Sequence, residues 1–253
     1  MSSFKTKDFF DSIAVNYSKR YTSADHRRIF FNNRINFSLQ DEDIADKIIL
    51  DIGAGSGILY HKIKHLVSDY KAWDISEVIM KQGGIPPECY RVIKNSLQEV
   101  VANEKYDYIF MLGVTTYLSD AQLSEYLAQI RACCHSQTRI IISYTLDNFI
   151  HRSWRIFLKK VYSIFLQAFL KRKDLLITSD IKFSHHSPLN CIFISREFEC
   201  YDCNYQNIFL PPFDRLMPRS ILLIIDRLVN KILGQKLIRF LASDLTVKYR
   251  YIK

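Results

Sequence analysis

The chain has 253 residues, 48% of them hydrophobic, which is enough to form the core of one α/β domain with a modest insertion. Its six cysteines include a single CxxC, Cys200 to Cys203, and no second pair that would complete four metal ligands. We therefore expect neither a metal site nor a disulfide framework. No stretch reaches the roughly 18 apolar residues that a membrane span needs, and residues 1–10 contain no apolar signal segment, so we expect a cytoplasmic protein.

The net charge of +9 is unevenly distributed along the sequence. Residues 1–150 hold 17 Lys/Arg against 18 Asp/Glu, whereas residues 151–182 hold 8 against 2 and residues 210–253 hold 9 against 3. The first part is therefore almost neutral, and the basic excess belongs to the second part. A partner with negative charge, such as an anionic acceptor, a nucleic acid or a membrane surface, would meet that second part.

The first part of the chain alternates between helical and strand patterns. Helices are expected near 4–20 and 26–38, followed by strand 47–52, helix 57–67, strand 70–74, helix 76–82, strand 90–94, strand 106–112, helix 120–133 and strand 138–145. Residues 48–50 and 140–142 are continuous apolar runs, which is typical of parallel strands covered by helices on both faces. The series predicts a doubly wound α/β sheet.

This alternation stops after Asn148. Apolar residues recur at steps of three and four over residues 151–173, and basic residues fall outside that stripe, which predicts an inserted amphipathic helix. A strand near 199–208, a long helix at 219–241 and a last strand at 245–252 follow.

Residues 48–60, IILDIGAGSGILY, hold the most informative pattern: a strand that ends on Asp51, then a turn with three alternate glycines, then a helix. Glycine has no Cβ and tolerates positive φ, so such a turn lets a cofactor approach the bare backbone. A phosphate-binding loop would need Lys-Ser or Lys-Thr after Gly57, which is absent. A dinucleotide fingerprint would need its third glycine where this chain has Ile58. The turn therefore favours another nucleotide-type cofactor.

The motif DIGAGSG at residues 51–57, together with Asp74 at the end of the second strand, resembles the class I S-adenosylmethionine-dependent methyltransferases. In that family the acid that closes strand two binds the ribose hydroxyls of the cofactor. A carboxylate suits this task because it can accept from two hydroxyls at once. The spacing from the glycine turn to Asp74 matches the family pattern, so the resemblance implies S-adenosylmethionine as the cofactor and S-adenosylhomocysteine as the product.

The resemblance extends over most of the chain and implies a fold. That fold is the α/β, Rossmann-like methyltransferase fold, with a doubly wound, mostly parallel sheet of seven strands and a helical insertion or cap after strand five. It also implies one methyltransferase domain over residues 1–253, in which residues 1–40 form an N-terminal helical lid and residues 149–190 form the insertion or cap.

Three further segments resemble the family. Residues 9–17, FFDSIAVNY, are similar to the helix that folds over the cofactor, residues 92–97 lie where the family contacts the adenine, and residues 106–118 are similar to its strand-four block. Where the family usually has an adenine-binding Asp, this chain has Asn95, whose side-chain carbonyl can accept the same hydrogen bond. The cofactor-binding residues that the resemblance implies are Tyr17, Asp51, Gly53, Ala54, Gly55, Asp74, Ile75, Asn95, Ser96, Leu112, Gly113 and Tyr117.

The acceptor side of the site has weaker signals. After strand four there is neither an Asn/Asp-Pro-Pro-aromatic block nor a Pro-Cys pair, which mark families that methylate bases or amides. His185 and His186 precede a region that faces the acceptor in similar enzymes, so either could remove a proton near neutral pH. Alternatively, His185 and His186 are surface residues that precede a helix and have no catalytic role. Tyr144, at the end of strand five, either lines the substrate site or is a packed aromatic.

These patterns predict methyl transfer to oxygen or nitrogen of a small-molecule or lipid-like acceptor. Two alternatives stay open: a tRNA or rRNA methyltransferase that uses the basic segments, and a cofactor-binding partner subunit that is not itself catalytic. The helix at 151–173 and the apolar run at 221–232 would form either a cap over the pocket or a surface that rests on a membrane, which would make the protein membrane-peripheral.

Overall fold

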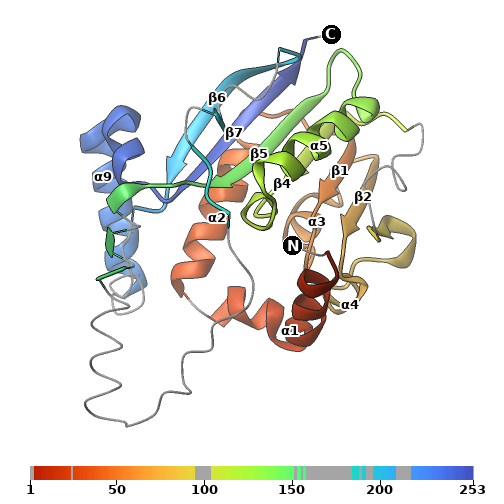
Figure 1. The fold of residues 1–253 in the computed structure, drawn as a ribbon, viewed down its shortest axis with the longest axis horizontal. Coiled ribbons are helices and arrows are strands. Elements are labelled where there is room, and N and C mark those ends of the chain that lie inside the picture. Colours follow the sequence, from red (N-terminus) through yellow and green to blue (C-terminus); the bar gives the residue numbers. More distant parts are fainter. Residues whose placement is uncertain are drawn as a thin grey trace.

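The computed structural model describes residues 3–23, 25–94, 104–150, 153–154, 156–157, 184–187, 190–191, 196–208 and 218–252. Within these residues one sheet forms the centre of the molecule, and helices lie on both of its faces (Figure 1). The doubly wound α/β fold that the sequence predicts is therefore confirmed.

Seven strands of the described part form the sheet, in the order β3-β2-β1-β4-β5-β7-β6. They are β1 (Ile48–Ile52), β2 (Asp69–Asp74), β3 (Tyr90–Val92), β4 (Tyr108–Met111), β5 (Arg139–Thr145), β6 (Phe198–Gln206) and β7 (Asp244–Tyr251). Strands β1 to β5 run parallel, and β7 runs antiparallel to both β5 and β6. The reversed last strand is thus inserted between β5 and β6, in a sheet that is otherwise mostly parallel, as predicted.

The helices of the described part follow the predicted order. They are α1 (Ser3–Ser23), α2 (Asp25–Leu39), α3 (Ile58–Ile63), α4 (Glu77–Gln82), α5 (Asp120–Ile130) and α9 (Arg219–Leu241), with 3-10 turns at Pro87–Cys89, Thr115–Tyr117 and Arg131–Cys133. Helix α5 begins with a capping box, in which Ser119 and Gln122 each satisfy a backbone N–H of the other. The predicted insertion helix at 151–173 and the predicted cap at 149–190 lie mostly outside the described residues.

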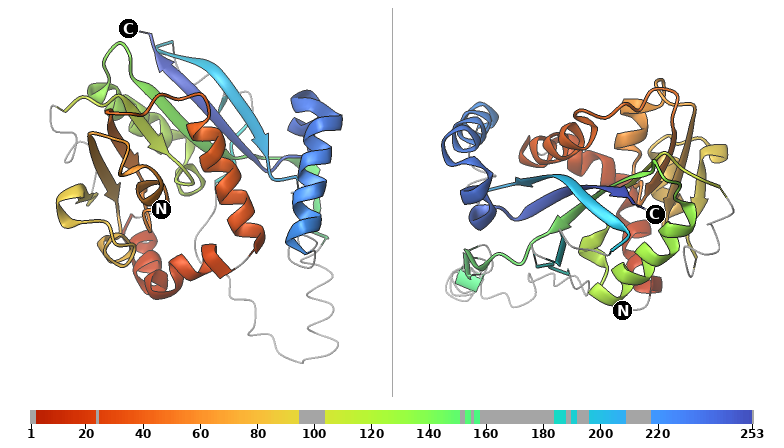
Figure 2. Two further views of the ribbon diagram at one scale, coloured as in Figure 1. Left: turned by 180° about the vertical axis from the view of Figure 1, so that it is seen from behind. Right: turned by 90° about the horizontal axis from the view of Figure 1, so that it is seen from above.

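Helices cover both faces of the sheet (Figure 2), and a hydrophobic core on each face holds the layers together. Ile49 of β1 and Phe110 of β4 belong to the core under α2 and α3. Their chain neighbours Leu50 and Ile109 belong to the core under α5. Successive side chains of a strand point to opposite faces, so strands that are apolar at every position need helices on both sides. All four side chains are fully buried.

The carboxyl ends of β1, β2 and β4 meet at one edge of the sheet. Because β7 runs in the opposite direction, its first residue, Asp244, reaches the same edge, where it pairs with Thr145 at the end of β5. On the far flank of the sheet, α9 lies beside β6 (Figures 1 and 2). None of the helices in the described part has the length and apolar content to cross a membrane.

Candidate active site

The glycine turn after β1 is held against β2 and β4. The Gly53 N–H donates to the Trp73 carbonyl oxygen at 2.6 Å, which fixes the turn to the end of β2. A Cβ on Gly53 would lie 1.9 Å from Cγ2 of Val114 in the loop after β4, so only glycine fits there. At Gly55 the nearest atom to a Cβ would be Cε1 of Tyr17, at 3.5 Å. The turn therefore presents bare backbone toward α1.

Asp74, the last residue of β2, is buried beside this turn. Its Oδ2 accepts a hydrogen bond from the Gly55 N–H at 2.9 Å, and its Oδ1 accepts one from the Ser76 N–H at 2.9 Å. Burial raises the pKa of Asp74, while these amide hydrogen bonds oppose the shift. A carboxylate has about four acceptor positions, so Asp74 keeps the capacity to accept from two hydroxyls of a ligand.

Asp51, in β1, is a second buried carboxylate at the same edge of the sheet. Its Oδ2 accepts a hydrogen bond from the Tyr70 hydroxyl at 2.5 Å. Burial raises the pKa of Asp51 to about 7; the Tyr70 hydrogen bond opposes the rise and the nearby Asp74 adds to it. Within the described part of the chain neither acid has a basic partner. Two buried carboxylates without cations favour a positively charged ligand.

A buried ion pair forms another part of the same region. Arg34 of α2 donates from Nη2 to Oδ1 of Asp244 at 3.3 Å, and their side chains are 5% and 9% exposed. Asp244 also accepts hydrogen bonds from Asn207 at 3.1 Å and from Ser243 at 2.6 Å. A Cβ on Gly113 would lie 2.9 Å from Nη1 of Arg34, so the guanidinium lies directly against the loop after β4. Arg34 thus brings a fixed positive charge to this loop.

Helix α1 covers the site with aromatic rings. Phe10 packs edge-to-face against Tyr117, with 5.1 Å between ring centroids, and against Tyr17, with 5.9 Å. The helix is attached to α4 by Asp11, which accepts a hydrogen bond from the Ser76 hydroxyl at 2.5 Å. Ser76 is also the N-cap of α4. Helix α1 is therefore fixed two residues beyond the buried acid that ends β2.

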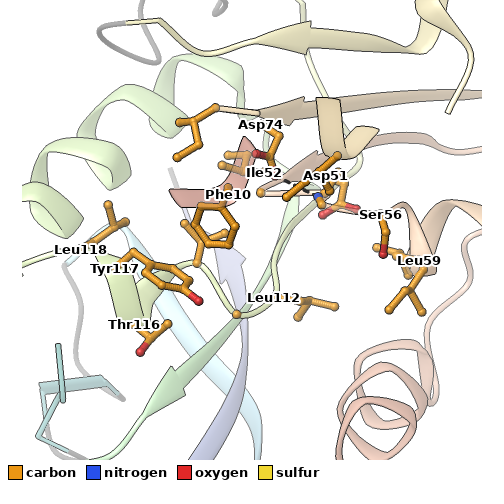
Figure 3. A pocket seen from close by; sticks show the side chains of 18 of the residues that line it. Phe10, Asp51, Ile52, Ser56, Leu59, Asp74, Leu112, Thr116, Tyr117 and Leu118 are labelled. Atoms are coloured by element: carbon orange, nitrogen blue, oxygen red, sulfur yellow. Dashed lines mark hydrogen bonds between the residues drawn. The ribbon is translucent and has the colours of Figure 1, made fainter. Parts of the chain in front are cut away.

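These elements surround a cavity of about 340 Å³, within the size range of small-molecule sites (Figure 3). Figure 3 shows Asp51 and Asp74 near one another and the rings of Phe10 and Tyr117 side by side. The predicted cofactor-binding residues that line the cavity are Tyr17, Asp51, Gly53, Ala54, Gly55, Asp74, Ile75, Leu112, Gly113 and Tyr117. Asn95 and Ser96 lie outside the described residues, so their contact with adenine stays a prediction.

At the end of β5 it is Thr145, and not Tyr144, that lines the cavity. The Tyr144 side chain is 1% exposed, and its hydroxyl lies 3.1 Å from that of Tyr249 in the core. Neighbouring side chains of a strand point to opposite faces, so a difference of one residue decides which of the two reaches the site. The side chain that reaches the cavity is therefore that of Thr145, while Tyr144, the predicted substrate contact, lies in the core.

His186 is buried and has a partner at each ring nitrogen. Its Nδ1 lies 2.9 Å from Oδ1 of Asp120, and its Nε2 lies 3.0 Å from the carbonyl oxygen of Thr115. Both ring nitrogens of His186 therefore already contact groups of the protein. Neither His185 nor His186 is among the described residues that line the cavity, and a role as base stays a prediction for both.

The sequence did not identify Arg34 and Asp244 as parts of the cavity wall. The sequence does contain a signal for Arg34, which stands beside Ile35 and three residues after Phe31 and so interrupts an apolar helix face. A cation that is buried on such a face needs an anionic partner. Asp244 has no local signal, because its position depends on the antiparallel pairing of β7 with β5.

A family model described as a methyltransferase domain matches residues 24–173, which is more than half of the chain. The chain therefore belongs to this family. Its sheet order, glycine turn and strand-two acid are those of the class I enzymes, so it is an S-adenosylmethionine-dependent methyltransferase, as the sequence predicts. A search of curated protein sequences gives no significant match.

Solved methyltransferase structures share the fold over nearly the whole chain. Magnesium protoporphyrin IX methyltransferase (ChlM) from Synechocystis PCC 6803, with bound S-adenosylhomocysteine, aligns with a TM-score of 0.62 at 13% identity, over 99% of this chain and 100% of that one. The N-methyltransferase NodS from Bradyrhizobium japonicum WM9, also with S-adenosylhomocysteine, gives 0.61 at 9% identity, over 98% and 100%. DhpI, in a complex described as DhpI-SAM-HEP, gives 0.58 at 11% identity, over 99% of both chains. At these identities the likeness shows the fold and does not identify the acceptor.

Proposed function

We propose that this enzyme transfers the methyl group of S-adenosylmethionine to an oxygen or nitrogen of a small-molecule or lipid-like acceptor. The observation that carries the proposal is the charge pattern of the cavity wall. Beside the glycine turn lie two buried acids with no basic partner among the described residues, and against the loop after β4 lies a buried arginine that is paired with Asp244. The cofactor complements this pattern, because it has two positive groups, a sulfonium and an ammonium, and one carboxylate. When bound, it supplies a methyl group that the sulfonium has already activated.

Three of the charged residues of the wall fit parts of the cofactor. Asp74 would accept hydrogen bonds from the ribose hydroxyls, using the acceptor positions that its two amide partners leave. Asp51, next to the bare backbone of the turn, would face the positive amino-acid end. Arg34 is the only basic side chain among the described residues that line the cavity, and it would bind the carboxylate.

The apolar and aromatic residues would orient the reactants. By the family resemblance, Leu112 and Gly113 would lie against the methionine part of the cofactor and Tyr117 would lie near its methyl group. Phe10 and Tyr17 would help the lid to exclude water, because they pack together above the glycine turn. Methyl transfer from a sulfonium depends mainly on in-line alignment and exclusion of water, so the enzyme does not require a dedicated catalytic group. An acceptor atom that carries a proton would require a base.

The remaining part of the wall suits a small or lipid-like acceptor. Phe31, Ile35 and Tyr126 supply apolar surface, while Thr145 and Gln122 offer a hydroxyl and an amide. Small-molecule sites commonly combine a mostly apolar wall with a few polar groups that fix orientation. The excess of basic residues in 151–182 and 210–253 would serve a partner surface rather than the reacting atoms.

Titration calorimetry with S-adenosylmethionine and, separately, with NAD tests this proposal. We expect binding of the first compound only. Asp74→Ala should weaken that binding at least about 100-fold, because two charge-assisted hydrogen bonds to the ribose are lost. Asp69→Ala is the matched control, since Asp69 starts the same strand but is 44% exposed and pairs with Lys71. Binding of NAD would overturn the cofactor assignment, and wild-type affinity in Asp74→Ala would overturn the ribose contact.

A further inference from the structure

Helix α9 presents a row of large apolar side chains to solvent. Ile221, Ile224, Leu228 and Ile232 are 44%, 56%, 49% and 74% exposed. At 3.6 residues per turn these four positions fall within a sector of about 80° around the helix. We call them the α9 stripe. A continuous exposed apolar surface of this kind is unusual on a soluble protein and marks a site of interaction.

The α9 stripe is separate from the surface that attaches the helix to the domain. Leu222 and Ile238 are each 1% exposed, and Val229 packs against the core on the α5 face of the sheet. A surface helix normally has polar residues outside its buried stripe. Before Gly234, whose backbone is not helical, α9 is instead apolar over two neighbouring sectors, and only the sector with Leu222 and Val229 contributes to the protein's own core.

Basic side chains border the α9 stripe. Arg227 and Lys231 are exposed and lie one helical turn apart, next to the stripe and away from the buried sector. Over its whole length α9 contains five Lys/Arg and one Asp. Two copies of such a face would repel each other, whereas an anionic surface would attract it. This charge complementarity selects a negatively charged partner over a second copy of the chain.

The exposed apolar surface continues at the C-terminal end of α9. Asn148 donates from Nδ2 to the carbonyl oxygens of Phe240 and Ala242 at 2.6 and 3.0 Å. This contact places Phe149 and Ile150, which are 71% and 39% exposed, beside that end of the helix. Phe240 is itself 55% exposed. The segment after β5 thus adds Phe149 and Ile150 to the exposed apolar surface at the C-terminal end of α9.

We propose that the α9 stripe, together with Phe149 and Phe240, docks onto an anionic lipid surface. The apolar side chains would enter the boundary between head groups and acyl chains, while Arg227 and Lys231 would reach the phosphates. None of these described side chains lines the cofactor cavity. The proposal therefore concerns the surface to which the enzyme binds, and it does not depend on how the cofactor is bound.

Vesicle flotation with the full chain tests the docking. We expect at least about tenfold more protein on vesicles of phosphatidylcholine with about one-third phosphatidylglycerol than on phosphatidylcholine alone. At about 0.5 M salt, where screening is short-ranged, the difference should be largely lost. Equal binding to both kinds of vesicle, or binding to neither, would overturn the proposal.

Paired variants separate the apolar and electrostatic contributions. Leu228→Ser/Ile232→Ser and Arg227→Gln/Lys231→Gln should each reduce binding to the anionic vesicles at least about tenfold. Leu66→Ser, which changes a 45% exposed leucine outside α9, should leave it unchanged. All three proteins should bind S-adenosylmethionine like the wild type in calorimetry, so a failed docking is distinguishable from a failed cofactor assignment. A dimer in sedimentation analysis that Leu228→Ser/Ile232→Ser dissociates would assign the stripe to a second copy instead.

Discussion

Buried acids at the two edges of the sheet are stabilised in opposite ways. At the amino edge, Glu42 precedes β1 and accepts hydrogen bonds from Arg139, Tyr201 and Lys248. Burial alone would raise the pKa of Glu42, but these hydrogen bonds outweigh it and lower the pKa below its usual range. The charge of this acid is therefore compensated within the protein.

At the carboxyl edge, Asp51 and Asp74 have no basic partners among the described residues. Tyr70 and two backbone amides are their donors, and burial raises the pKa of both acids. The described chain thus supplies cations to Glu42 and none to Asp51 and Asp74, so we expect the charge of Asp51 to be balanced by a positively charged group of the ligand.

The largest expected effect is on folding, at the amino edge. Glu42→Gln should lower the free energy of unfolding by about 3 kcal/mol, because Lys248, 1% exposed, would keep, as oxygen contacts from other residues, only the Gln40 carbonyl oxygen and a 3.9 Å contact with Asp202. Urea unfolding measures the change. Glu199→Gln, in a surface pair with Arg250, is the control and should cost less than about 1 kcal/mol. Cofactor affinity should be unaltered in both folded variants; a large loss in Glu42→Gln would break the distinction between the two edges.

An intermediate effect is expected at the buried arginine of the cavity wall. Arg34→Met should reduce the affinity for S-adenosylmethionine by about 10- to 100-fold, because the ligand carboxylate loses a charge-assisted partner. The variant should also lose stability, since Asp244 would be left with Asn207 and Ser243 only. Adding Asp244→Asn should restore the stability and not the affinity. Recovery of both in the double variant, by thermal unfolding and calorimetry, would mean that Arg34 acts only in folding.

The smallest expected effect is a dependence on pH. Between the ordinary Asp value of 3.8 and about 7, folded Asp51 retains a proton that the unfolded chain has lost, so its contribution makes the free energy of unfolding decrease as pH rises. A cationic ligand prefers the ionised acid. Affinity for S-adenosylmethionine should therefore rise with pH, by less than about tenfold between pH 6 and pH 7. Calorimetry over this range should show a flatter profile for Asp51→Asn; an identical profile would argue against the contact.

The parts of the molecule that local patterns determine could be predicted from the sequence. The apolar runs of β1 and β5 identify buried parallel strands, and the glycine turn with Asp74 identifies the cofactor side, because these features lie within or next to single elements. The family resemblance then supplies the order of the remaining elements. Predicting the cofactor-binding half of the site required little further information.

The rest of the site depends on contacts that no local pattern encodes. The Arg34–Asp244 pair requires the antiparallel insertion of β7, and the choice between Tyr144 and Thr145 depends on a register of one residue. The partners of His186 come from the loop after β4 and from α5, so its surroundings could not be read from its neighbours in the chain. The periodicity of α9 indicates an apolar helix but not which sector the domain covers.

The ion pair between Arg34 and Asp244 joins residues that are 210 positions apart. It can form only after β7 has entered the sheet between β5 and β6, and contacts of such long sequence separation form slowly. A folding intermediate without β7 would already have the glycine turn and the strand-two acid, but its pocket would lack one wall. Tight ligand binding therefore marks the completion of folding, and a bound ligand would in turn oppose the detachment of the last strand.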